Sequence, residues 1–337
     1  MNQRRQPWIA SVVVLILCFC LPAAADKSAK KKASHVETNS ASALLWRDPG
    51  DISSLDLRYG SGGKAHEPAG KFKFLKEDKQ GTSAKFDIED EQGVHWRAKL
   101  GEEAKPETAA TRLLWAVGYF ADEDYYLPEL RVEGMPKLSR GNKFISADGI
   151  IRGARLKRQH KEQKKIGNWS WFHNPFVGTK ELSGLKTMMA LMNNWDLKEI
   201  NNAIFDEGGG VHHYEVSDVG ATFGRTGNPF TRSKSNLKDY RGTKFIQKTA
   251  SERVDFVIRS RPFFLTAIDV PNYITRTKMQ GIVKKIPRTH AAWVGQLLGR
   301  LSAEQIRDCF RAAGYSPDEV EGFAKVVQGR IAELNQL

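Results

Sequence analysis

The chain has 337 residues, of which 52 are Lys or Arg and 39 are Asp or Glu, so its formal net charge is +13. A positive balance favours anionic partners such as phosphates, acidic glycans, a membrane surface or nucleic acid, and by itself it selects none of them. Of its three cysteines only Cys309 lies beyond residue 20, which excludes a disulfide-stabilised scaffold for the rest of the chain.

The first 25 residues have the physical marks of a cleavable secretion signal. Arg4 and Arg5 give a positive start, Trp8 to Leu21 form an uncharged apolar run, and small residues follow at 22–25. The apolar run is shorter than the roughly 20 residues of a membrane span, and an uncleaved anchor is the alternative. We expect a mature chain that begins at Asp26, carries a formal charge of +11, and lies in the periplasm or outside the cell.

Residues 26–45 are rich in Lys, Ser and Ala and have no periodic apolar pattern, which is typical of a flexible linker. The pattern of β-strands begins at Lys71. Segments at 71–75, 85–88 and 94–100 are separated by turn sequences, which predicts a three-stranded meander.

A helix is predicted between Pro106 and Gly118, because the apolar residues between them recur at helical spacing. A further strand is expected at 125–132. The stretch 152–165 is dense in Arg and Lys, and we expect it to be a solvated loop or hairpin.

The second half of the chain is predicted to be mainly helical. Thr179 begins a helix that ends at Asn193, and its Leu and Met residues form an apolar stripe that packs in the core. Helix-start signatures at 302–305 and 316–319 predict a closing pair of helices. Strands first and helices later indicate an α+β protein of two lobes.

Between these helices lie two polar segments. Asp196, Lys198 and Asn201 form a D-x-K-x-x-N loop, and a Gly-rich hairpin leads from it to Asp218 in the sequence D-V-G. This order resembles the catalytic and metal-binding loops of protein kinases. The resemblance is to divergent members of the superfamily, since the helix from Pro106 onward resembles those of HipA-type and Golgi secretory-pathway kinases.

The resemblance implies a role for each side chain of the two loops. Asp196 would accept the proton of an attacking hydroxyl, and Lys198 would neutralise charge on the moving phosphoryl group. Asn201 and Asp218 would hold Mg²⁺, or Mn²⁺ as an alternative, against the triphosphate of ATP, because hard cations prefer carboxylate and amide oxygens. Gly220 would let the chain turn sharply after the metal ligand.

Three upstream residues fit the nucleotide-binding half of the same family. Lys99 ends the third predicted strand, where kinases place the lysine that binds the α- and β-phosphates. Glu107 would pair with it from the following helix, with Glu103 or Glu102 as the alternative partner. The turn at Gly81 has the place of the phosphate-covering loop.

The resemblance therefore implies a two-lobed protein-kinase-like fold, with an antiparallel-sheet N-lobe at 46–150 and a mainly helical C-lobe at 151–337. The sequence departs from the family pattern at several points, among them a short separation between Lys99 and Glu107 and no A-P-E-like segment after Gly220. Asn194 and Trp195 stand where many kinases have His-Arg, Val219 replaces the usual Phe, and no G-x-G-x-x-G lies near the turn of the first hairpin.

Two functions stay open. One is an exported phosphotransferase that moves the γ-phosphate of ATP to a hydroxyl of a protein, glycan or lipid, with no nucleic-acid partner. The other is a non-catalytic, pseudokinase-type module that binds an acidic envelope component. Catalysis requires Asp196, Asn201 and Asp218 to converge on one cleft with Lys99, whereas a binder needs only a basic surface.

Three other segments have an expected place. The aromatic stretch 169–176 is expected to fill the core, with a stacking platform for a sugar or base as the alternative. The basic stretch 225–244 follows D-V-G, where a loop that binds an anionic substrate would lie. His212 and His213 face opposite ways on a strand and predict no metal site.

Overall fold

The structure is a computed structural model that describes residues 43–337 except 207, 209, 227–231 and 259–276. The expected signal peptide at 1–25, and residues 26–42 of the expected linker, lie outside the described residues.

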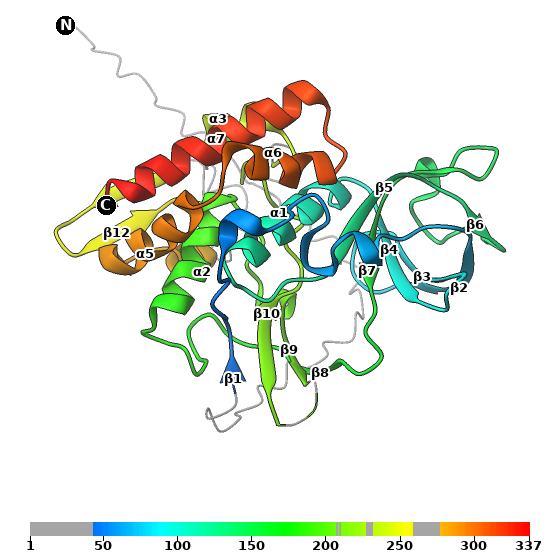
Figure 1. The fold of residues 1–337 in the computed structure, drawn as a ribbon, viewed down its shortest axis with the longest axis horizontal. Coiled ribbons are helices and arrows are strands. Elements are labelled where there is room, and N and C mark those ends of the chain that lie inside the picture. The colour runs from blue at the N-terminus through cyan, green and yellow to red at the C-terminus, as the bar shows by residue number, and fades with distance from the viewer. Residues whose placement is uncertain (1–42, 207, 209, 227–231, 259–276) are drawn as a thin grey trace, which may run out of the picture. The chain divides into compact units, whose positions relative to one another are not determined.

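A six-stranded sheet forms the first lobe (Figure 1). Its strands are β2 (Phe72–Asp78), β3 (Lys85–Asp90), β4 (His95–Leu100), β5 (Asp124–Leu130), β6 (Val132–Glu133) and β7 (Ile151–Arg158). Their order is β5-β7-β4-β3-β2-β6, and every neighbouring pair is antiparallel except β2 with β6. The predicted meander is confirmed as β2, β3 and β4. It forms because alternate residues such as Phe86, Ile88 and Trp96 are buried against the sheet's own hydrophobic core.

The expectation of a solvated loop at 152–165 is wrong for its first half. Strand β7 pairs with both β4 and β5, so the sheet continues past residue 150 to Arg158. Ala154 and Leu156 are fully buried, and between them Arg155 is 4 % exposed. A buried arginine is tolerated here because carboxylates of neighbouring elements pair with it.

Helix α1 (Ala104–Ala116) is buried on nearly every side. It contacts strands β5 and β7 of the sheet and helix α6 (Ala303–Ala312), so it connects the sheet to the helices. Its apolar residues Ala109, Ala110 and Leu113 belong to the hydrophobic core of the helices rather than to that of the sheet. The predicted helix is confirmed, with a start two residues before Pro106.

The second lobe is mainly helical, and its described helices also include α2 (Lys180–Leu191), α3 (Leu237–Gly242), α5 (Arg288–Gly299) and α7 (Pro317–Asn335). The three predicted helix starts are confirmed: Thr179 caps α2, and Ser302 and Ser316 form complete capping boxes at α6 and α7. The expected two-lobed α+β organisation, a mainly antiparallel sheet followed by a mainly helical lobe, is thereby confirmed.

Two smaller sheets complete the described structure. The first has the order β1-β10-β9-β8, with β1 (Ala43–Leu44), β8 (Lys164–Gly167), β9 (Asn202–Asp206) and β10 (His212–Val216). The second consists of β11 (Ile246–Thr249), β12 (Arg253–Phe256) and β13 (Ile286–Pro287). The expected linker extends to residue 45, but in the structure the ordered fold already begins at residue 43. Strand β1 pairs with β10, and Leu45 is buried in the core.

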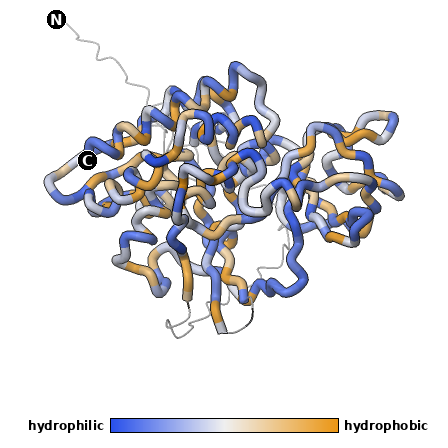
Figure 2. Tube along the Cα trace, viewed as in Figure 1, coloured by the Kyte–Doolittle hydropathy of each residue, from blue (hydrophilic) through white to orange (hydrophobic). Residues whose placement is uncertain are grey.

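The two tryptophans of the aromatic stretch fill the core, as expected, whereas Phe172 and His173 are exposed. Trp169 and Trp171 are buried against each other with their ring centroids 4.8 Å apart, and the Trp169 indole donates to the carbonyl of Glu215. Phe172 is 41 % exposed. Figure 2 shows polar and apolar residues alternating over short distances along the traced chain. Among the described residues no helix is both long and apolar enough to cross a membrane.

Candidate active site

The β9–β10 hairpin brings the two candidate metal ligands together. Asn202 opposes Val216 in the hairpin, and the next backbone bond runs from the Ser217 amide to the Asn201 carbonyl at 2.8 Å. Asn201 and Asp218 therefore leave the same open end of the hairpin on adjacent backbone segments. Asn201 and Ser217 are 16 positions apart in the chain, and the antiparallel pairing of β9 with β10 places them side by side.

The D-x-K-x-x-N loop is closed by its own side chains. The Lys198 ammonium lies 2.8 Å from Asp196 Oδ1, and the Asn201 amide nitrogen donates to the Asp196 carbonyl at 2.7 Å. The same nitrogen lies 3.4 Å from Asp196 Oδ2. The three functional groups of the loop therefore share one small volume, with Asp196 in the middle.

The loop is tied to the segment after Asp218 by Asn193 and Trp195, the residues on either side of Asn194. Asn193 ends α2 in the left-handed conformation, at φ 51°, and its amide donates to the Gly224 carbonyl at 2.6 Å. The Trp195 amide donates to the Ala221 carbonyl at 3.2 Å. These bonds fix the two loops to each other through buried backbone.

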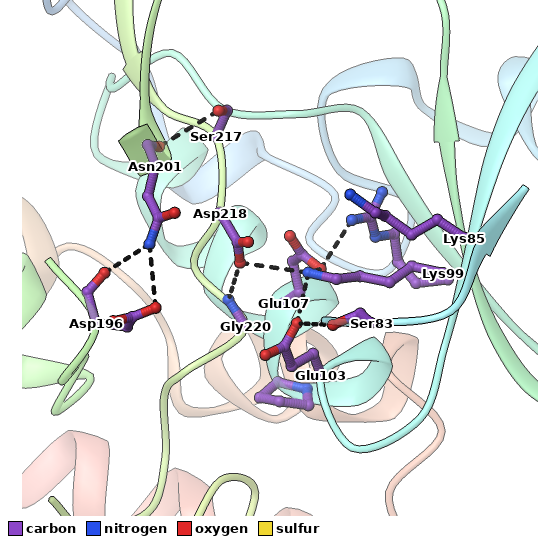
Figure 3. Close-up of polar contacts among 12 residues, drawn as sticks. Ser83, Lys85, Lys99, Glu103, Glu107, Asp196, Asn201, Ser217, Asp218 and Gly220 are labelled. Carbon is purple, nitrogen blue, oxygen red and sulfur yellow. Dashed lines mark hydrogen bonds and ion pairs between the residues drawn. The ribbon is translucent and has the colours of Figure 1, made fainter. Parts of the chain in front are cut away.

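Lys99 lies at the end of β4, where its ammonium faces three carboxylates (Figure 3). It is 2.8 Å from Glu103, 2.9 Å from Glu107 and 3.3 Å from Asp218. Burial alone would lower the pKa of Lys99, but the three carboxylates raise it above its ordinary value, so the ammonium stays charged. Of the three partners considered from the sequence, Glu107 and Glu103 both pair with Lys99, and Glu102 is exposed.

Behind Lys99 the ion pairs continue into the sheet. Arg155 Nη2 lies 2.8 Å from Glu107, and Arg155 Nη1 lies 3.4 Å from Asp124. Glu107 is 1 % exposed, so it is held between Lys99 and Arg155 in a fixed orientation. Burial raises the pKa of Asp124 to about 7, with Arg155 opposing the shift. The network orients Lys99 from the protein interior.

Asp218 is the carboxylate of this group that meets solvent. Its side chain is 43 % exposed, and Oδ1 accepts from Lys99 and from the Gly220 amide. Partial burial raises the pKa of Asp218, and Glu107 and Glu103 add to the rise while Lys99 opposes it. A divalent cation at this carboxylate would relieve the repulsion among the three acids.

The loop between β2 and β3 covers the cleft from the side of the sheet. Gly81 adopts a left-handed conformation with φ 72°, which suits glycine, and Arg140 donates to its carbonyl and to that of Gln80. The loop also sends Ser83 inward, where its hydroxyl donates to Glu103 at 2.8 Å.

All seven site residues that the sequence singled out line one cavity of about 660 Å³. They are Gly81, Lys99, Glu107, Asp196, Lys198, Asn201 and Asp218. Cationic side chains from the sheet and from the connection to the second lobe line it as well: Lys85, Arg97, Arg155, Lys157, Arg158 and Lys165. The cavity is therefore a cleft. Lys99 and the carboxylates around it line one end, and the basic side chains line a wall.

The donor set at the acidic end fits a magnesium ion held together with a triphosphate. The Asn201 amide nitrogen donates to Asp196, which leaves the amide oxygen on the side that faces Asp218 (Figure 3). Mg²⁺ needs only one or two protein oxygens when phosphates supply the others. Among the described residues no cluster of three or more His, Cys, Asp or Glu side chains is arranged to hold a metal.

Sequence reasoning missed part of the site. Arg155 was hidden in a stretch that resembled a solvated loop, although its apolar neighbours Ala154 and Leu156 were a signal of a strand. The reason given for Gly220 was also wrong, since its backbone does not have a positive φ. A Cβ there would lie 2.7 Å from the Cβ of Glu103, so glycine is needed for close approach of α1.

The basic stretch 225–244 is described except for residues 227–231. Arg232 and Lys234 lie over the ring of Trp195, at 5.3 and 5.5 Å from its centroid. Lys234 also pairs with Glu103. The stretch therefore contacts Trp195, just before the D-x-K-x-x-N loop, and Glu103, just before helix α1.

No protein-family model matches the chain, and no curated protein matches it. Among solved structures, the chain is similar to one described as the crystal structure of a Helicobacter pylori proinflammatory kinase, CtkA. The TM-score is 0.45 and the sequence identity 10 %, over 80 % of this chain and 98 % of that one. What this chain does has to be read from the chemistry of its own cleft.

Proposed function

We propose that the protein is an exported, kinase-like phosphotransferase that moves the γ-phosphate of ATP to a hydroxyl of a protein, glycan or lipid. The observation that supports it is convergence: Asp196, Asn201 and Asp218 line one cleft with the Lys99–Glu107 ion pair. These residues come from a strand, a helix and two loops that are far apart in the sequence. A chance D-x-K-x-x-N loop would have no reason to face them.

In phosphoryl transfer the protein mainly aligns the reacting groups and neutralises the charge of the phosphates. Lys99, held by Glu107, contacts the α- and β-phosphates. Asp196 orients the acceptor hydroxyl and takes its proton, and Lys198 neutralises charge on the transferred group. Mg²⁺, held by Asn201 and Asp218, would supply the positive charge that the triphosphate needs.

The test is Mg²⁺-dependent stabilisation by nucleotide in the parent and in Asp218→Asn. We expect ATP with Mg²⁺ to raise the melting temperature of the parent, because binding to the folded state stabilises it by mass action. The Asn variant keeps the volume of the side chain and loses the charged ligand, so the part of the shift that depends on Mg²⁺ should disappear. Equal Mg²⁺-dependent shifts in both proteins would contradict the metal role.

A matched control is Asp206→Asn. Asp206 lies at the opposite end of the same hairpin, where its carboxylate accepts from the Gly208 amide. This variant makes the same chemical change away from the cleft. We expect it to keep the full Mg²⁺-dependent shift of the parent.

The second candidate is a non-catalytic module for an acidic envelope component. It is favoured by the basic wall of the cleft, where Arg97, Lys157 and Arg158 lie beside the acids. The same experiment separates the two functions. Stabilisation by polyanions, with no dependence on Mg²⁺ and no preference for nucleotide, would support the binding module.

A further inference from the structure

Glu103 accepts from three donors that come from three separate segments. Lys99 of β4 is 2.8 Å away, the Ser83 hydroxyl of the β2–β3 loop is also 2.8 Å away, and Lys234 comes from the segment after D-V-G. The Glu103 side chain is 14 % exposed and that of Lys234 is 22 % exposed. Two ammonium groups and a hydroxyl therefore surround one carboxylate at the inner end of the cleft; Figure 3 shows Glu103 with two of these residues, Lys99 and Ser83.

Two of the donors have contacts that do not involve Glu103, since Lys234 also lies over the ring of Trp195. Lys99 is already held by Glu107, which Arg155 fixes from behind. Ser83 lies in a loop that Arg140 stabilises through backbone carbonyls. Donors that surround a carboxylate can bind another anion in its place, because an ionised acceptor makes strong hydrogen bonds with them.

The Glu103 side chain can also move away from these three donors without disrupting helix α1. It is the residue that precedes α1, yet its side chain caps none of the described amides at the start of that helix. The backbone carbonyl of Glu103 accepts from the Glu107 amide whichever way the side chain points. Rotation of the side chain would therefore break contacts with Lys99, Ser83 and Lys234 and leave α1 intact.

We infer that Ser83 and Lys234 are, with Lys99, ligands of the triphosphate, and that the Glu103 carboxylate occupies their subsite until phosphate oxygens displace it. The inference rests on the proposed function, because it assigns a nucleoside triphosphate to this cleft. Binding exchanges one anion for another on the same three donors. Burial alone would raise the pKa of Glu103, but Lys99 and Lys234 hold it well below its ordinary value, so the carboxylate is ionised and competes with phosphate.

The first test measures dissociation constants by titration calorimetry for Mg²⁺–ATP and for inorganic tripolyphosphate. Glu103→Gln keeps the shape of the side chain and removes its charge. We expect about tenfold tighter binding of both ligands, since the repulsion between like charges a few ångströms apart is removed. Glu102→Gln is the control: it makes the same change of net charge at an exposed neighbouring residue, and it should bind as the parent does.

The second test removes the donors in the Glu103→Gln background. Ser83→Ala and Lys234→Met should each weaken the binding of tripolyphosphate several-fold, because each deletes one phosphate ligand. Lys248→Met removes an exposed lysine of β11, outside the basic stretch and the cavity, and should leave binding unchanged. If Ser83→Ala and Lys234→Met bind as tightly as their background, the two residues are not ligands and the inference is overturned.

The outcomes separate this inference from the proposed function. If the parent binds Mg²⁺–ATP and Glu103→Gln binds no tighter than Glu102→Gln, only the displacement of Glu103 is wrong. If neither the parent nor Glu103→Gln binds either ligand, both proposals fail. Binding by Glu103→Gln alone would support both, with the carboxylate acting as a strong competitor.

Discussion

At the scale of single residues, the D-x-K-x-x-N loop places three proposed roles within six positions. Asp196 faces both Lys198 and Asn201, whose amide also donates to the Asp196 carbonyl. If the proposed roles hold, the three residues should affect nucleotide binding and phosphate transfer differently.

Asp196→Asn should keep nucleotide binding and lose transfer. The metal ligands remain in place, while the proton acceptor is gone, and general-base catalysis typically accounts for about 10²–10⁴-fold in rate. Lys198→Ala should also spare binding and slow transfer, because its charge matters most while the phosphoryl group moves. Asn201→Ala should weaken both together, since it removes a metal ligand and the bond that holds the loop closed.

The measurement is nucleotide affinity alongside phosphate transfer, with autophosphorylation or ATP hydrolysis as the readout when no acceptor is known. The roles are distinguished by comparing the loss of nucleotide binding with the loss of phosphate transfer in each variant. An active parent whose Asp196→Asn variant turns over at the parental rate would show that Asp196 is not the base.

At the scale of elements, Asn193, two residues beyond the end of α2, sets the position of the D-x-K-x-x-N loop. Asn193 adopts φ 51°, a left-handed conformation in which a Cβ is strained, and its amide bonds to the Gly224 carbonyl. Asn tolerates this conformation better than most residues because its short polar side chain makes local hydrogen bonds.

Two substitutions at this position separate the backbone effect from the hydrogen bond. Asn193→Gly and Asn193→Ala both lose the bond to Gly224, but only the Ala variant retains the strained Cβ. We expect the Ala variant to have a free energy of unfolding about 1 kcal/mol lower than the Gly variant. Urea unfolding of both proteins measures the difference. Equal stability would mean that the loop relaxes to another conformation when the side chain is lost.

The elements that were predicted well from the sequence are determined by residues that lie close together along the chain. Thr179, Ser302 and Ser316 cap helices with side chains that lie within three residues of the amides they bind. The D-x-K-x-x-N loop and the hairpin that follows it are local in the same sense. Their residue types and spacing were therefore enough to identify the candidate site.

The elements that the sequence predicted poorly depend on distant partners. Arg155 is buried because Glu107 and Asp124 pair with it, and Ala43 and Leu44 form a strand because β10 lies beside them. Glu103 could be named as a partner of Lys99, but its contact with Lys234 joins residues 131 positions apart. No local pattern encodes such contacts, so the full arrangement of donors around Glu103 emerges only in the folded chain.

At the scale of the whole molecule, export remains a prediction from the sequence. Residues 1–25 have a positive start, an apolar run and small residues before Asp26, which is the order of a cleavable signal. Cys18 and Cys20 lie inside the apolar run rather than directly after a small residue, so we expect no lipid on the mature chain.

The expected result is a secreted chain that begins near Asp26 and has the mass of the unmodified polypeptide. Intact-mass measurement and N-terminal sequencing of the protein recovered from the periplasm or medium test both points. A retained segment from Trp8 to Leu21 would mean a membrane anchor, and an added acyl mass would mean lipid attachment.

Replacing Ala23 and Ala25 with bulky residues is the control, because signal peptidase needs small side chains before the cleaved bond. Cleavage should then fail and the apolar run should stay on the chain. Unchanged processing of that variant would place the cleavage site elsewhere and contradict Asp26 as the new N-terminus.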